Sequence, residues 1–489
     1  CYDKRAILLF DSGAARQVTT VLATILAVFG ALAVAYCVWA AIASARTPQG
    51  AAAWVVFLVS SPWFGVPAFL VLGRRKVRDY RAAWRESHDL FSIQDTEASR
   101  GTLPFEREKT LRALERIGGL PFTGGNEVRL LIDGGATFDA ICAVVDSARE
   151  SVCVQFYIIR DDGLGRRLAD HLVAAAARGV KVRVMYDGVG SQKLPEAWAA
   201  RLRDAGVAVL NPDHSRGPTS RLEINFRNHR KTVVVDGDVA FVGGHNVGDE
   251  YLGLDPQFGR WRDTHVEIRG PVAGQIQAVF AEDWHWASGE SLTDDLPWEA
   301  GDATDPENAT LAALVPTGPG DPIDSGSLMF FTAITAARDR IWIASPYFVP
   351  DTDIMSALVS AALAGRDVRI LLPSTIDHYL PWLASHAYFD ELRATGVRFF
   401  RYCDGFLHQK VILVDDDLAA VGTANLDNRS FRLNFESMVF VADGAFASDV
   451  ERMLSDDFVQ SDELISALVD QPLHIRISSP LARLWAPLL

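Results

Sequence analysis

The chain has 489 residues, of which 49% are hydrophobic, and it carries a formal net charge of -15. This length accommodates a membrane segment and two domains of ordinary size. The acidic balance argues against a nucleic-acid-binding protein and against adhesion to anionic lipid by charge alone. Five cysteines are scattered without a spaced cluster, which indicates neither a disulfide framework nor a zinc site.

The N-terminal region carries no charged residue between Arg16 and Arg46, nor between Arg46 and Arg74. Two stretches within it, residues 18–42 and 51–72, reach the length of about 20 apolar residues that a membrane span requires. We therefore predict a hairpin of two transmembrane helices. A cleaved signal peptide is the alternative for the first stretch, but its apolar core is too long and a second stretch follows at once.

Flanking charge predicts the orientation of this hairpin. The turn between the spans carries only Arg46, whereas basic residues crowd the exit of the second span: Arg74, Arg75, Lys76, Arg78, Arg81 and Arg85. Positive charge favours the cytoplasmic side, so the N-terminus and everything after residue 73 are expected in the cytoplasm. The chain begins with Cys1, and whether this is the native N-terminus is left open.

From about residue 126, short apolar runs alternate with amphipathic stretches, a pattern typical of βαβ units. The order strand, helix, strand, strand occurs twice, over residues 152–159, 163–178, 181–186 and 206–210, and over residues 341–349, 352–364, 367–372 and 396–400. This internal duplication predicts two similar tandem α/β domains that meet around a pseudo-two-fold axis and share one cleft.

The predicted divisions of the chain are the hairpin over 1–73, a connector over 74–125 with a helix at 106–117, a first domain over 126–287, a polar linker over 288–310, and a second domain with the C-terminal tail over 311–489. The apolar tail from Pro472 to Leu489 is expected either to pack on the core or to rest at the bilayer interface.

The pattern His-x-Lys-x4-Asp occurs twice, at His229, Lys231 and Asp236 and again 179 residues later at His408, Lys410 and Asp415, and each copy leads to a glycine and an asparagine. The apolar, β-branched runs inside both copies read as buried strands. Positions two apart on a strand share a face, so each histidine projects beside its lysine.

Paired histidines and aspartates also suit a metal, yet a lysine beside each histidine would repel a divalent cation, so no metal site is predicted. An imidazole flanked by fixed cations suits an anionic substrate, because preorganised donors meet the charge that develops on phosphoryl oxygens. The doubled motif therefore predicts phosphoryl transfer.

Two histidines can divide this work, since one attacks phosphorus while the other protonates the leaving oxygen and later deprotonates the incoming hydroxyl. The nucleophile needs its second ring nitrogen held by an acceptor. Equivalent strands downstream of the two motifs offer Asp263 and Glu436 for this task. Asp236 and Asp415 end their strands at turns, where an aspartate is commonly a hairpin residue, so a structural role is weighed before a chemical one.

These residues resemble the phospholipase D superfamily, and within it the bacterial cardiolipin synthases. The likeness is carried by the doubled motif with its tails Gly243-Gly244-His245-Asn246 and Gly422-Thr423-Ala424-Asn425, by Trp261-Arg262-Asp263-Thr264-His265, by Ser345-Pro346-Tyr347-Phe348-Val349-Pro350 and by Asn434-Phe435-Glu436. Together with the apolar N-terminus, the likeness covers nearly the whole chain.

The resemblance implies that one phosphatidylglycerol donates its phosphatidyl group to a histidine, with release of glycerol, and that a second phosphatidylglycerol attacks the intermediate to give cardiolipin. It implies His229 as nucleophile and His408 as general acid and base, although the pseudo-symmetry allows the reverse. Lys231, Lys410, Asn246 and Asn425 would bind phosphoryl oxygens, and a hydroxyl at Thr423 would add a contact that Gly244 lacks. No cofactor is implied.

The expected partners are phosphatidylglycerol, other phospholipids and the bilayer, without nucleic acid, and a homo-oligomer is left open. A membrane-bound phospholipase D that hydrolyses phospholipids to phosphatidic acid is the alternative. A phosphodiesterase or nuclease of the same superfamily is disfavoured by the net charge and the apolar segments.

Overall fold

The structure is a computed structural model that describes residues 4–44, 48–72, 101–212, 226–298 and 310–489. The packing of the backbone divides the chain into two units, residues 1–82 and 83–489, and each is described by itself. The basic cluster after residue 73 and residues 299–309 of the predicted linker lie outside the described residues.

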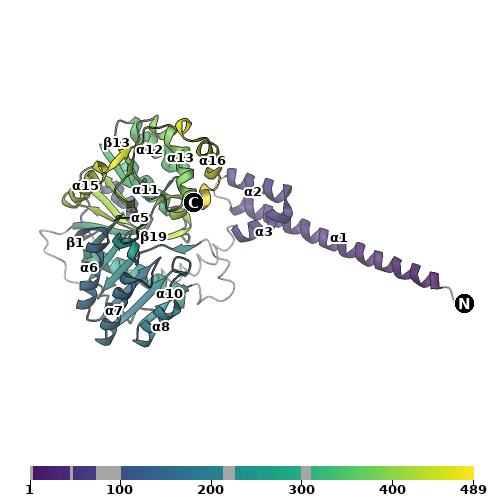
Figure 1. Cartoon of the computed structure of the whole chain (residues 1–489), viewed down its shortest axis with the longest axis horizontal. Helices are drawn as coiled ribbons and strands as arrows, with labels where there is room; N and C mark the ends of the chain where they lie inside the picture. The colour runs from purple at the N-terminus through teal and green to yellow at the C-terminus, as the bar shows by residue number, and fades with distance from the viewer. Residues whose placement is uncertain (1–3, 45–47, 73–100, 213–225, 299–309) are drawn as a thin grey trace. The chain divides into compact units, whose positions relative to one another are not determined.

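The N-terminal unit contains the helices α1 (Lys4–Ser44), α2 (Pro48–Ser60) and α3 (Pro62–Leu72). In the described residues, the segment Gln17–Ala43 of α1 is the one stretch of helix long and apolar enough to cross a membrane. Figure 1 shows α1 as one long helix. This segment agrees with the first predicted span.

The second predicted span is two short helices rather than one continuous helix. Proline has no N–H for an intrahelical hydrogen bond, and α2 ends before Pro62. A Cβ added to Gly65 would lie 3.0 Å from the Cα of Leu58, although residues seven apart in a straight helix are separated by about 10 Å of rise. The helix α3 therefore folds back on α2, and Leu58 and Phe69 pack together with Cys37 of α1.

The elements of the first half of the second unit are α5 (Glu108–Gly118), β1 (Thr123–Ile132), α6 (Asp133–Ser147), β2 (Ser151–Phe156), α7 (Gly163–Ala177), β3 (Lys181–Tyr186), α8 (Glu196–Asp204), β4 (Ala208–Leu210), β5 (Arg227–Asn228), β6 (Thr232–Val235), β7 (Val239–Gly243), β8 (Trp261–Arg262), β9 (Thr264–Arg269) and α10 (Pro271–Ser288).

The elements of the second half are β10 (Thr310–Thr317), α11 (Ser325–Ala336), β11 (Arg340–Ala344), β12 (Phe348–Val349), α12 (Thr352–Leu363), β13 (Asp367–Pro373), α13 (Tyr379–Arg393), β14 (Arg398–Tyr402), β15 (Phe406–Leu407), β16 (Val411–Val414), β17 (Leu418–Gly422), β18 (Leu426–Asp427), α14 (Asn428–Arg432), β19 (Asn434–Ala442), α15 (Gly444–Val459), β20 (Ser461–Glu463) and α16 (Leu473–Arg483).

One sheet runs through both halves in the order β20-β14-β13-β11-β16-β17-β19-β10-β1-β9-β7-β6-β2-β3-β4. Apart from β20, the order reads the same from each edge toward the centre, where β1 and β10 pair antiparallel and join the halves. Figure 1 shows β1 and β19 in the middle of this unit, between the first half in blue and teal and the second in green and yellow. The predicted pair of similar α/β domains is confirmed as two halves of one sheet.

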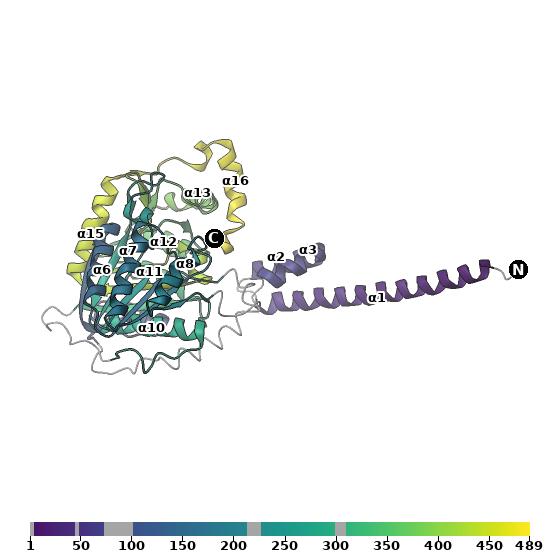
Figure 2. The same ribbon diagram turned by 60° about the horizontal axis from the view of Figure 1, so that its bottom comes forward.

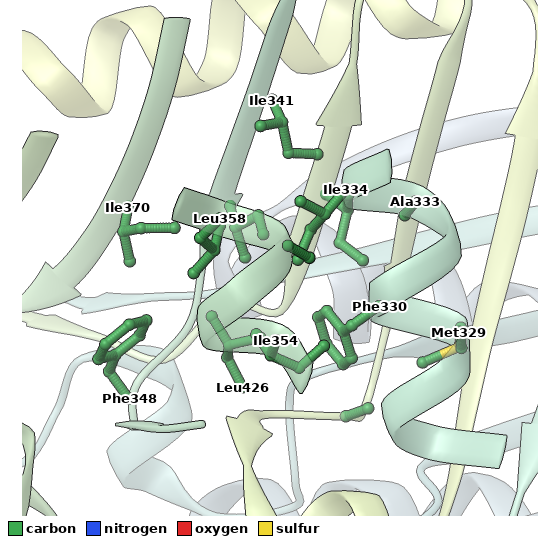
Figure 3. Close-up of a cluster of buried hydrophobic side chains, with 14 of the residues drawn as sticks. Met329, Phe330, Ala333, Ile334, Ile341, Phe348, Ile354, Leu358, Ile370 and Leu426 are labelled. Carbon is green, nitrogen blue, oxygen red and sulfur yellow. The ribbon is translucent and has the colours of Figure 1, made fainter. Parts of the chain in front are cut away.

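Helices cover both faces of this sheet. The helices α6, α7 and α8 pack on one face of the first half, and Figure 2 shows α6 and α7 side by side there. In the second half, side chains of α11 and α12 point toward strands β11 and β13 in one apolar cluster that includes Phe330, Ile354 and Ile370 (Figure 3). The helices α10 and α15 share a second cluster with strands of both halves, including Val266 and Val439. Burial of apolar side chains on both faces therefore makes the sheet rigid where the motif strands lie.

Several details differ from the predicted elements. The predicted strand 341–349 is divided into β11 and β12, because Pro346 cannot donate to the sheet and the Ser345 hydroxyl closes a turn by donating to the Tyr347 carbonyl at 2.8 Å. The start of the predicted linker is packed, since Leu292 is buried in the core. The predicted helix 106–117 is confirmed as α5, and α16 of the C-terminal tail packs on α13 while Leu473 and Ile477 stay exposed.

Candidate active site

Two short strand pairs carry the motif histidines across from one half to the other. Strand β5 pairs parallel with β19 of the second half, and the His229 N–H donates to the Phe435 carbonyl at 3.0 Å. Reciprocally, β15 pairs parallel with β8 of the first half, and the His408 N–H donates to the Arg262 carbonyl at 2.8 Å. Each histidine is therefore held by the opposite half.

This exchange decides which carboxylate meets which histidine. The Nδ1 of His229 lies 2.9 Å from Oε2 and 3.0 Å from Oε1 of Glu436. The Nδ1 of His408 lies 2.8 Å from Oδ2 of Asp263. Both predicted orienting residues are thus in place, and each acts on the histidine of the other half.

The two histidines differ in what else surrounds Nδ1. Around His229, the Nζ of Lys231 donates to the His229 carbonyl at 2.6 Å. Around His408, the Nζ of Lys410 also donates to the carbonyl of its histidine, but in addition it lies 2.8 Å from Nδ1, beside the Asp263 carboxylate. A carboxylate neighbour favours a proton on Nδ1, so His229 is arranged to leave Nε2 with a free lone pair, whereas the ring of His408 has an acceptor and a cation competing for Nδ1.

The centre is buried, and burial dominates its electrostatics. Burial lowers the pKa of His229 to about 4, and burial together with Lys410 and Lys231 holds the pKa of His408 well below its usual value. Burial also lowers the pKa of Lys231 to about 7 and that of Lys410 to about 8. Desolvation disfavours every charged form here, so an entering anion that pairs with the lysines would be bound strongly.

The two halves support their carboxylates differently at one equivalent position. The Thr423 hydroxyl donates to Oε2 of Glu436 at 2.6 Å, while a Cβ on Gly244 would lie 2.0 Å from Oδ1 of Asp263. The single hydroxyl proton of Thr423 is therefore engaged by Glu436. This geometry does not support the predicted phosphate contact of Thr423, and it explains the difference between glycine and threonine that sequence alone left unassigned.

The two predicted phosphate-binding asparagines flank the centre. Asn246 accepts from the Ile158 N–H at 3.0 Å and donates to the Tyr251 hydroxyl at 3.0 Å. Asn425 donates weakly to Asp427 at 3.4 Å, and its buried Oδ1 has no hydrogen-bond partner in the described part of the chain. Each amide group keeps a second N–H for a ligand.

The last residue of each motif, in contrast, is structural. Asp236 follows β6 with a φ of 53° and accepts the N–H groups of Arg149, Glu150 and Ser151 at 2.8 to 2.9 Å. Asp415 follows β16 with a φ of 50° and accepts three consecutive N–H groups from residue 338 onward, at 2.8 to 3.1 Å. These contacts support the structural role that was weighed first for Asp236 and Asp415, in which each fixes the far end of its strand.

Aromatic residues that sequence reasoning missed enclose the histidines. The ring of Tyr157 meets His229 edge-on with centroids 5.0 Å apart, and Trp261 lies 5.3 Å from His408. Asn434 was named only within the resembling stretch and was given no role, although its amide donates to Oε1 of Glu436 at 3.0 Å. A signal was available for Asn434, because it stands two residues before Glu436 on the same face of β19.

No group of three or more His, Cys, Asp or Glu in the described ranges is placed to hold a metal ion. His245 and His265 lie close to the centre, with their Nδ1 atoms 3.0 Å apart. Burial lowers the pKa of each to about 3, so both are neutral. The arrangement can therefore act on an anionic phosphodiester through two imidazoles and two ammonium groups.

Comparisons with known proteins agree with this site. A family model described as "Cardiolipin synthase, PLD-like domain" matches residues 141–284 and 330–458. Cardiolipin synthase A of Pseudomonas putida (strain KT2440) is 46% identical over 459 residues, which cover 92% of this chain and 94% of that protein. Cardiolipin synthase A of Pseudomonas entomophila (strain L48) is 46% identical over 461 residues, covering 92% and 95%.

Among solved structures, phosphatidylserine synthase from Haemophilus influenzae Rd KW20 matches with a TM-score of 0.57 at 15% identity. The match covers 78% of this chain and 100% of that chain. At this identity the likeness supports the fold alone.

Proposed function

We propose, for a chain that belongs to the cardiolipin synthases of the phospholipase D superfamily and is a phosphatidyltransferase, a reaction in two steps. In it, the protein joins two phosphatidylglycerol molecules through a phosphohistidine intermediate and releases glycerol. The observation that carries the proposal is the reciprocal pairing of His229 with Glu436 and of His408 with Asp263.

In the first step, Nε2 of His229 attacks phosphorus and the bond from phosphorus to the glycerol oxygen breaks. His408 supplies the proton that the departing glycerol oxygen takes up. Glu436 supports this role of His229, because a carboxylate at Nδ1 fixes the ring and stabilises the positive charge that develops on it. The negative charge of the bound phosphodiester raises the pKa of His408 and lets it carry that proton.

In the second step, His408 takes the proton from a hydroxyl of the second phosphatidylglycerol, and that oxygen attacks phosphorus as the bond to His229 breaks. Lys231 and Lys410, together with the free N–H groups of Asn246 and Asn425, would hold the phosphoryl oxygens in both steps. Their fixed positions place positive charge where the transition state gains negative charge.

Phospholipids are the substrate class that cardiolipin synthesis requires, and the apolar segment of α1 associates the chain with a membrane. We further propose that the chain is a multi-pass protein of a bacterial inner membrane, with the catalytic unit in the cytoplasm. The crowding of six basic residues between Arg74 and Arg85 supports this orientation. A second crossing would require α2 and α3 to straighten into one helix.

The test is lipid analysis by mass spectrometry after the purified protein is incubated with phosphatidylglycerol vesicles. We expect cardiolipin and free glycerol, neither of which forms with the His229→Ala protein. Phosphatidic acid as the sole product would mean that water is the acceptor and that the chain is a phospholipase D. Absence of any product would contradict both the proposed donor and the mechanism.

A further inference from the structure

Three polar side chains form a hydrogen-bonded cluster that the mechanism above does not use. The Tyr347 hydroxyl donates to Oδ2 of Asp377 and lies 3.0 Å from Nδ1 of His378, which in turn lies 2.7 Å from the same carboxylate oxygen. Asp377 also accepts the His378 N–H at 2.7 Å. The cluster comes from two loops, one between β11 and β12 and one between β13 and α13.

The cluster lines a pocket on the surface of the second half. Its walls include Pro346, Tyr347, Asp377, His378, Trp382 and Arg401. The side chain of His378 is 69% exposed, whereas that of Asp377 is 14% exposed. The carboxylate thus lies at the base of the pocket with the imidazole at its mouth.

Both loops are fastened to segments that carry the catalytic motif. On one side, the Ser345 hydroxyl accepts from the Leu426 N–H at 3.0 Å, and β12 pairs with β18 directly after Asn425. The residue after Tyr347 is Phe348, which is anchored in the apolar core (Figure 3). On the other side, the Thr375 hydroxyl donates to the Gly405 carbonyl at 3.4 Å, three residues before His408.

Electrostatics agree with this placement. The charge of Asp377 opposes the lowering of the pKa of His408 and of Lys410, so the carboxylate acts on the same centre as the motif residues. The hydrogen bond to Asp377 raises the pKa of His378. The pocket therefore combines the Asp377 carboxylate with the polar side chains of Tyr347, His378 and Arg401.

We infer that the Tyr347, Asp377 and His378 cluster binds the glycerol headgroup as a vicinal diol, and so selects the alcohol that enters and leaves beside His408. The inference rests on the proposed transfer reaction. Asp377 already accepts from the Tyr347 hydroxyl, the His378 ring and the His378 backbone N–H, so its carboxylate keeps one acceptor position for a substrate hydroxyl. The Tyr347 oxygen beside it can accept from the second hydroxyl of a diol. The flat ring of Trp382 suits the carbon backbone of a small polyol.

One alcohol pocket serves both steps. In the first, glycerol leaves with the proton from His408; in the second, a headgroup hydroxyl returns a proton to His408 and forms the new bond to phosphorus. Because these steps are the same reaction in opposite directions with different alcohols, the leaving and attacking oxygens occupy one position.

In the experiment, the full-length protein is incubated with phosphatidylglycerol vesicles and an equimolar mixture of 1,2-propanediol and 1-propanol. The ratio of the two phosphatidyl alcohols that form is measured by mass spectrometry. Both products come from one intermediate in one tube, so the ratio does not depend on how much protein is folded. The wild type should favour the diol, and Asp377→Asn should reduce that preference about tenfold, the worth of about one hydrogen bond.

His378→Gln is the second variant, because its side chain is mostly exposed and its loss does not threaten folding. Asp353→Asn removes an exposed carboxylate from α12 of the same half and should leave the ratio unchanged. An unchanged ratio in both Asp377→Asn and His378→Gln would overturn the inference while leaving phosphatidyl transfer intact. Failure of the wild type to use either alcohol, with phosphatidic acid as its product, would instead overturn the proposed function.

Discussion

Asp263 and Glu436 hold the two motif histidines with different support. Glu436 receives hydrogen bonds from the Thr423 hydroxyl and the Asn434 amide, whereas Asp263 lies directly against Gly244 and accepts the Thr264 N–H at 2.8 Å. The shorter carboxylate is therefore positioned by close backbone packing and the longer one by side-chain donors. A change at Gly244 should act on His408 alone.

We predict that Gly244→Ala lowers the rate of cardiolipin formation by on the order of 100-fold, since a catalytic group displaced by 1 Å loses about that much. The added Cβ would meet Asp263 Oδ1 at 2.0 Å and push the carboxylate away from His408. Gly135→Ala is the matched control, because a Cβ there meets nothing within 4 Å. Equal rates for the two variants, measured on folded protein, would show that the contact with Asp263 does not matter.

The lowered lysine pKa values predict how an oxyanion binds as the pH changes. A lysine whose pKa is lowered keeps its charge below that value and loses it as the pH rises, here through about 7 for Lys231 and about 8 for Lys410. The Kd of tungstate, a phosphate-like dianion, should stay level up to about pH 7 and then rise by about tenfold per pH unit for each lysine that loses its proton.

Calorimetric titration of the purified protein would measure this dependence. The Lys231→Met protein should bind tungstate more weakly at low pH. Its Kd should lack the increase that begins near pH 7 in the wild type, because that increase comes from Lys231. A Kd that stays level to pH 10 would show that the lysines keep ordinary pKa values or do not contact the anion.

Most of the site residues could be predicted from the sequence, because repetition at a fixed spacing separates the histidines and lysines from surface residues of the same kind. The pairing of Asp263 with His408 and of Glu436 with His229 could not, since alignment matches each carboxylate to its own half. The cluster at Asp377 left no sequence signal, because two loops of the second half that are about 30 residues apart bring it together.

At the scale of elements, the strands β6 and β16 end in equivalent turns that are closed by Asp236 and Asp415. Each aspartate satisfies N–H groups at the start of the neighbouring strand, β2 or β11. Arg107 adds an ion pair to Asp415 at 2.5 Å. These contacts stabilise the end of each motif strand that lies away from its histidine and lysine.

We predict that Asp415→Asn destabilises the fold and spares catalysis. Burial alone would raise the pKa of the Asp415 carboxyl group. Hydrogen bonds from the N–H groups of Arg340, Asp339 and Arg338 outweigh burial and lower this pKa to about 2. This depressed pKa stabilises the fold above the unfolded value of 3.8, by about 2 kcal/mol, and the stabilisation is lost as the pH falls toward 2.

The variant should melt at a lower temperature at neutral pH, while its activity per folded molecule stays within about twofold of the wild type. Asparagine tolerates the positive φ of this position, so the change isolates the charge. Loss of activity without loss of stability would instead assign Asp415 a role in catalysis.

The strands and helices that were predicted in both halves followed from short apolar runs and amphipathic stretches, and strands such as β2 and β6 are buried along their whole length. The second apolar stretch forms two short helices, α2 and α3, where one continuous helix was predicted. Its hydropathy is high enough, but Pro62 ends α2, and Gly65 allows α3 to approach α2 closely. Composition predicts that a segment is apolar, whereas backbone details decide whether it is continuous.

At the scale of the whole catalytic unit, the two similar halves bring their motif residues to one candidate site rather than two. Strands β1 and β10 join the halves into a single sheet, and β5 and β15 cross over to place each histidine on the carboxylate of the other half. A half by itself would hold a histidine without its acceptor and a carboxylate without its histidine. Two-step transfer with a nucleophile and a separate acid and base requires both halves together.

The most direct measurement of this claim is the rate of cardiolipin formation from phosphatidylglycerol vesicles by two single variants, His229→Ala and His408→Ala, each compared with the wild type. If the histidines form one site, each variant should lose on the order of a thousandfold or more, because groups that act as a unit fail together. If either variant retains about half of the wild-type rate, the halves act independently and the shared site is contradicted.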